Sequence, residues 1–118
     1  MNNLNINSYE QKLELLNTKL LEFVNVLYKI IKDDNIKLYK KKIKLALMYD
    51  SNIIYDVCEK YLLTYENDII NKNDKVLINI EKNVLNNEIK LCQIWNNIDE
   101  DNKIIIWKYL NLFLLLVN

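Results

Sequence analysis

The chain has no glycine and no proline among its 118 residues. Glycine supplies most of the positive-φ positions of tight hairpins, and proline presets many turns, so their absence disfavours an all-β protein. Turns must then come from Asn and Asp, which tolerate the left-handed backbone next best. Hydrophobic residues make up 51% of the chain and charged residues 27%, a composition typical of globular proteins.

Histidine and arginine are absent too, since all 16 basic residues are Lys. Catalytic systems of the Ser-His-Asp and Cys-His types therefore cannot form, and neither can the Glu-x-x-His pair of carboxylate di-iron bundles. Without Gly no phosphate-cradling loop can be written, and without Arg there is no bidentate phosphate clamp. We predict a protein that is not an enzyme, with no catalytic residue and no cofactor.

Few of the remaining side chains could bind a metal. Cys58 and Cys92 form no CxxC motif and are too few for a zinc site, so we expect reduced thiols, with a disulfide or redox pair as the alternative. Asp56 and Glu59 share a helix face and could hold Mg²⁺ with a further carboxylate, but such spacing is also usual on a solvated helix. We predict no metal site.

Apolar residues recur at three- and four-residue spacing through most of the chain, which is the period of amphipathic helices. Ser8, with Gln11 three positions later, predicts the start of a long helix. The expected helices cover about 8–32, 36–49, 52–70, 74–95 and 99–118; the second and third could be continuous, and the fourth could be two shorter ones. The prediction is one all-α domain over 1–118, a compact bundle of five or six helices with short Asn/Asp turns, in which residues 1–7 are frayed.

The most distinctive polar feature is a stripe of lysines in the second helix. Residues 29–44 contain seven Lys and two Asp, a local charge of 7 − 2 = +5, so the rest of this neutral chain carries −5. Four of these lysines lie on one face beside an apolar stripe: Lys37, Lys40, Lys41 and Lys44. The stripe could be a solvated face, pair with the chain's own carboxylates, or bind an acidic partner, an anionic membrane or nucleic-acid phosphate.

The last helix is apolar almost all round, because between Ile104 and Val117 only Lys108 and Asn111 are polar. Fourteen residues span about 21 Å, short of the ~30 Å hydrocarbon core, so we predict no membrane span. One face, with Ile105, Tyr109, Leu112, Phe113 and Leu116, is expected in the core. The other is covered by the chain itself or binds a partner, and its candidate interface residues are Ile104, Trp107, Lys108, Asn111 and Leu115.

A short pattern spans the start of this helix. It consists of Trp95-x-x-Ile98, then Glu100 or Asp101 before Lys103, then Ile106-Trp107-x-Tyr109-Leu110-x-x-Phe113. It resembles the C-terminal segment of small helical proteins of unknown role from large nucleocytoplasmic DNA viruses of protists. The resemblance covers about the last quarter of the chain and implies a viral protein, but it transfers no activity.

These patterns favour a protein that works by binding another protein or a second copy of itself as a homodimer. The first ten residues have no basic region followed by an apolar run, so we expect no secretory signal and an intracellular, cytoplasmic location, in the host cytoplasm or the virion if the protein is viral. One alternative is an accessory nucleic-acid-binding protein that uses the lysine stripe. Another is a viral regulator that mimics a host helical cell-death protein, which rests on fold analogy alone.

Overall fold

Local capping signals set the ends of the long helices. The computed structural model describes residues 8–118, so the predicted fraying of residues 1–7 lies outside it. The first helix, α1, covers Tyr9–Ile31, and the Ser8 hydroxyl accepts the N–H of Gln11 as its cap. Asp33 caps α2 (Asp34–Tyr49), and Asp99 caps α7 (Glu100–Val117). The predicted starts of the first and last of these helices are confirmed, and α2 begins two residues before the predicted position 36.

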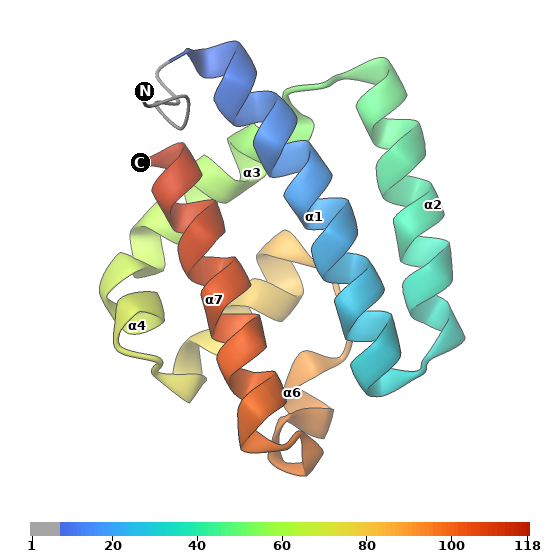
Figure 1. Ribbon diagram of the computed structural model, residues 1–118, viewed down its shortest axis with the longest axis vertical. Coiled ribbons are helices and arrows are strands. Elements are labelled where there is room, and N and C mark those ends of the chain that lie inside the picture. Colours follow the sequence, from blue (N-terminus) through green and yellow to red (C-terminus); the bar gives the residue numbers. More distant parts are fainter. Residues whose placement is uncertain (1–7) are drawn as a thin grey trace, which may run out of the picture.

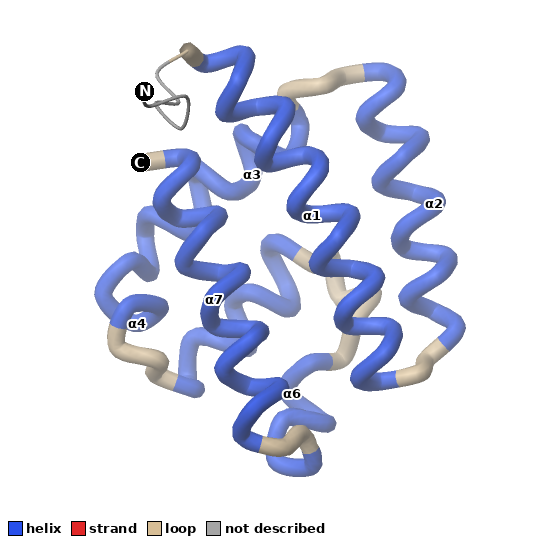
Figure 2. The backbone as a smooth tube through the Cα atoms, in the orientation of Figure 1, coloured by secondary structure: helices blue, strands red, loops and turns tan. Residues whose placement is uncertain are grey.

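Shorter segments connect α2 to α7. Helix α3 (Ile53–Leu62) runs through a 3₁₀ turn (Leu63–Tyr65) into α4 (Glu66–Ile70). After the turn at residues 71–73, the 3₁₀ turn Asp74–Val76, α5 (Leu77–Asn79) and a π-helical turn (Ile80–Val84) form one continuous segment. Helix α6 (Leu91–Ile94) follows and ends in the 3₁₀ turn Trp95–Asn97. Residues 8–118 thus form six helical segments and no strand, which confirms the all-α prediction (Figure 2).

The helices pack in two layers. Helices α7, α1 and α2 lie side by side and antiparallel in the front of Figure 1, and the shorter segments cover their back. Helix α2 stands at the edge, where α1 is its main neighbour. One continuous hydrophobic core lies between the layers and includes Phe23, Leu62 and Phe113, all fully buried. Within residues 8–118, no helix is long and apolar enough to cross a membrane.

Lysine takes two of the four left-handed backbone positions among residues 8–118. Asn86 and Asn87 have φ of 53° and 60°, as expected for turns made by Asn. Lys32 and Lys72, however, have φ of 59° and 55°. In L-residues with a Cβ this conformation costs about 1–2 kcal/mol, and glycine would reduce that cost. Asn and Asp occur in all three of these turns, since Asp33 follows Lys32 and Asn71 and Asn73 flank Lys72, but they take the left-handed position itself in only one.

Candidate binding sites

The outward face of α7 carries four of the five residues predicted as an interface. Ile104 and Lys108 are exposed, and Leu115 is 70% exposed. Asn111 is half-buried, and its Nδ2 donates to the carbonyl oxygen of Trp107 at 2.9 Å within the same helix. This face is open within the described chain, but its apolar side chains are few.

Trp107, the fifth predicted interface residue, belongs to the core, and the prediction for it is wrong. It is 4% exposed, whereas Ile105, expected in the core, is 37% exposed. The buried face of α7 is rotated by about 100°, one residue position, from the predicted face. Because the helix is apolar on both faces, the hydrophobicity of its sequence does not indicate which face is buried. Contacts with α1, α3 and α4 determine the buried face.

The lysine stripe of α2 lines a groove. All four lysines border a cavity of about 340 Å³ between α1 and α2, together with Val24, Asn25, Tyr28 and Ile36. The Lys40 ammonium donates to Asn25 Oδ1 at 2.8 Å, and the Lys37 ammonium lies 4.7 Å from the centre of the Tyr28 ring. Hydrogen bonding to Tyr28 raises the pKa of Lys37 above its ordinary value, so this ammonium stays charged.

No ion pair between side chains of residues 8–118 involves any of these four lysines. The neighbouring Lys42 does form one: its Nζ lies 2.6 Å from Glu88 Oε1. Pairing of the stripe with the chain's own carboxylates, one of the predicted alternatives, is thus not what the structure shows. A solvated face and an external anionic partner remain as explanations for the charge.

The outer face of α2 carries an apolar patch that was not predicted. It consists of four side chains that are more than half exposed: Leu38, Leu45, Met48 and Tyr49. Tyr49 reaches 92% exposure. Leu38, Leu45 and Tyr49 follow each other at i, i+7 and i+11, so they form a stripe about 16 Å long opposite the buried Ile36 and Ile43. That spacing is visible in the sequence and would have identified the patch.

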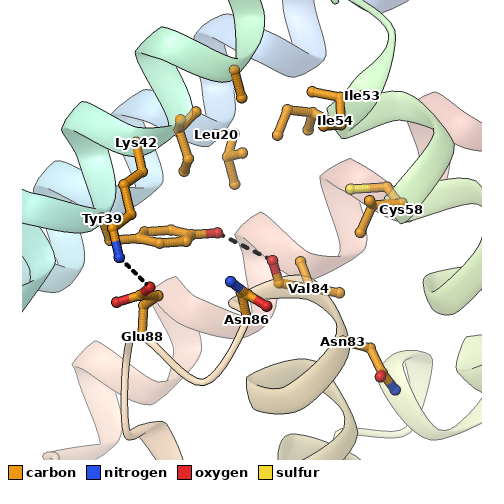
Figure 3. Close-up of a pocket in the computed structure, with 13 residues that line it drawn as sticks. Leu20, Tyr39, Lys42, Ile53, Ile54, Cys58, Asn83, Val84, Asn86 and Glu88 are labelled. Atoms are coloured by element: carbon orange, nitrogen blue, oxygen red, sulfur yellow. Dashed lines mark hydrogen bonds and ion pairs between the residues drawn. The ribbon is translucent and has the colours of Figure 1, made fainter.

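A pocket of about 310 Å³ lies on the other side of α2, beneath Tyr39, Lys42 and Ala46 (Figure 3). Its other walls come from α1, α3 and residues 83–88. Most of the lining side chains are aliphatic, among them Leu20, Ile43, Ile53, Ile54, Val57 and Val84. The pocket is therefore an apolar cavity with few polar groups, as small-molecule sites usually are.

The polar groups of this pocket are mostly satisfied. The Tyr39 hydroxyl donates to the carbonyl oxygen of Val84 at 3.1 Å, and burial raises the pKa of Tyr39 well above its ordinary value. The Cys58 thiol is fully buried, and burial raises its pKa to about 12, so it is neutral and unreactive at physiological pH. Both cysteines are free, in line with the expected reduced thiols.

No cluster of three or more Cys, Asp or Glu side chains within residues 8–118 is placed to hold a metal ion. Within residues 8–118, the candidate binding sites are the outer face of α7, the groove between α1 and α2, the apolar patch of α2, and the pocket on the other side of α2.

No protein family, curated protein or solved structure matches this chain. The viral resemblance, the cytoplasmic location and the mimicry of a host cell-death protein stay predictions.

Proposed function

We propose that this protein is a non-enzymatic binding module that holds an acidic partner protein against the outer face of α2. The proposal depends on one observation, the apolar patch of Leu38, Leu45, Met48 and Tyr49 at the edge of the bundle. Exposed apolar side chains grouped on one helix face are typical of interfaces, where a partner covers them. Tyr and Met are also enriched in the cores of interfaces.

The charges around the patch indicate the chemistry of the partner. Lys41 and Lys44 are exposed on one side of the patch, and Lys42 lies on the other. Lysine is depleted from the centres of interfaces but tolerated at their rims, where its ammonium can meet a carboxylate. The best complement is an amphipathic helix whose apolar face covers Leu38, Leu45 and Tyr49 and whose Asp and Glu side chains lie over the groove.

Two other occupants fit less well. A second copy of the chain placed on the same face would bring two lysine stripes together, and like charges there are unfavourable. Nucleic acid would use the lysines but leave the apolar patch exposed to water. The chain also lacks the Arg side chains that most often read bases.

The experiment uses a photoreactive residue at position 45 of the full-length chain, in cells that produce it. The partner protein that is cross-linked to this residue is then identified and purified, and its affinity for the unmodified chain is measured by calorimetry. We expect Leu45→Glu to weaken binding at least about tenfold, because it places a carboxylate in an apolar contact that faces acidic groups. The matched control is Leu115→Glu, the same change at an exposed leucine on α7, which should leave affinity unchanged. Rising salt should also weaken binding.

Three results would overturn the proposal. If only Leu115→Glu weakens binding, the interface lies on α7, as the sequence first indicated. If the cross-linked product is the chain itself, the protein is a homodimer. If RNA binds tightly and Leu45→Glu leaves that binding unchanged while reversal of Lys37, Lys40, Lys41 and Lys44 abolishes it, the stripe serves nucleic acid.

A further inference from the structure

The pocket beneath α2 has walls that depart from regular helix. Residues Ile80–Val84 form a π-helical turn, in which the Leu85 N–H donates to the carbonyl oxygen of Ile80 at 3.0 Å. Asn86 and Asn87 follow in consecutive left-handed conformations. π-turns are rare and occur frequently at functional sites, and left-handed non-glycine residues persist only where the surrounding structure holds them. Both irregularities belong to the segment that forms one wall of the pocket.

An ion pair ties the same wall to α2. Lys42 and Glu88 lie 2.6 Å apart, and beside them the Tyr39 hydroxyl donates to the carbonyl oxygen of Val84 (Figure 3). These two contacts fix the position of the irregular segment relative to α2. The pocket has a volume of about 310 Å³. A water molecule occupies ~30 Å³ in the liquid, so this is roughly the volume of ten water molecules.

We infer that this pocket binds a small neutral molecule, mostly hydrocarbon, with one hydrogen-bonding end. The aliphatic lining around Ile43, Ile54 and Cys58 has no unpaired charge to receive an ion. A carboxylate at the rim would share the Lys42 ammonium with Glu88 and would lie beside that like charge. An ammonium ion would share Glu88 with Lys42 and would likewise lie beside a like charge.

The Asn86 amide supplies the polar contact for the ligand. It lines the pocket and lies beside the Tyr39 hydroxyl in Figure 3, and no hydrogen bond within residues 8–118 engages its side chain. An amide can both donate and accept, so it suits an alcohol or an amide better than either ion. This inference is independent of the docking surface on α2.

The probe is 1-decanol, titrated into the full-length protein while the methyl signals of Ile43, Ile54 and Val57 are followed by NMR. We expect saturable shifts of these signals, confined to methyl groups that line the pocket. Decanoate and decylammonium should bind at least about tenfold more weakly, because burying an unpaired charge costs far more than burying a hydroxyl.

Two variants test the location. Ala46→Leu fills the pocket from α2 and Val57→Phe fills it from α3, so each should abolish binding. The control, Ile70→Met, changes an exposed side chain on α4 that does not line the pocket and should bind as the wild type does. The inference is overturned if decanol gives no saturable shift in the wild-type protein, which would make the cavity a packing void. It also fails if the folded pocket-filling variants bind decanol normally, or if decanoate binds more tightly than decanol.

Discussion

The indole rings of Trp95 and Trp107 meet edge to face, with centroids 5.6 Å apart and planes at 80°. This contact joins the 3₁₀ turn after α6 to the first turns of α7. Both rings are buried, and the Lys103 ammonium covers the Trp95 ring at 5.3 Å from its centre. Trp107 therefore anchors the end of the shorter layer against α7 and is not available to a partner.

Replacement of Trp107 by Ala should reduce the free energy of unfolding by about 3–5 kcal/mol, because it removes a large buried ring and leaves a cavity. The control is Leu115→Ala on the exposed face of the same helix, which should change stability by no more than about 0.5 kcal/mol. Urea unfolding followed by circular dichroism measures both. Equal losses in the two variants would contradict the burial of Trp107.

The ends of the long helices could be predicted because their signals are local. Ser8, Asp33 and Asp99 each accept a backbone N–H two or three residues later, and the sequence alone places them before an apolar run. The break at 86–88 in the apolar rhythm of residues 74–95 likewise predicted two short segments as one option. The π-turn before it has no comparable local signal.

The orientation of each helix about its axis was harder to predict. Helix α7 is apolar on nearly every side, so its buried face is set by contacts with α1, α3 and α4, which are distant in sequence. In α2, Leu38, Leu45 and Tyr49 share one face, but the lysines between them are the more conspicuous pattern in the sequence. The pocket depends on α2, α3 and residues 83–88 meeting in space, which no local pattern encodes.

Glu81 is the one buried charged side chain among residues 8–118, and it caps α6 from eleven positions upstream. Its Oε1 accepts the N–H of Cys92 at 3.0 Å, in the first turn of a helix whose preceding residue, Lys90, makes no side-chain cap. Glu81→Ala should cost about 1–3 kcal/mol, since it leaves a partly buried N–H without an acceptor. Urea unfolding measures the loss, and amide exchange at Cys92 should accelerate.

Glu81→Gln is the control for this cap, because the amide keeps an oxygen acceptor of the same size. It should be less destabilising than Glu81→Ala. If the two variants lose equal stability, the hydrogen bond to Cys92 is not what Glu81 contributes.

Tyr109 links α7 to α1 through a hydrogen bond whose strength depends on pH. Its hydroxyl donates to Glu22 Oε1 at 2.6 Å. Burial, with a smaller contribution from Glu22, raises the pKa of Tyr109 to about 12, and the same hydrogen bond lowers the pKa of Glu22. The neutral hydroxyl is favoured in the folded state, so its contribution to stability is complete below the unfolded pKa of 10.0 and is lost as pH rises towards about 12. The contribution of ionised Glu22 has the opposite sense and is lost as pH falls through its lowered pKa.

Tyr109→Phe should therefore flatten the fall in stability between pH 10.0 and about 12 and also flatten the fall in acid, because without its donor the pKa of Glu22 lies closer to its ordinary value. Denaturant unfolding across both pH ranges measures the two slopes. The matched control is Tyr49→Phe, which removes a hydroxyl from a side chain that is 92% exposed and should keep the wild-type slopes. Other groups also lose protons in alkali, so the difference between the two variants, and not the wild-type curve alone, isolates Tyr109. Identical alkaline slopes in Tyr109→Phe and Tyr49→Phe would mean that the pKa of Tyr109 is not raised in the folded protein.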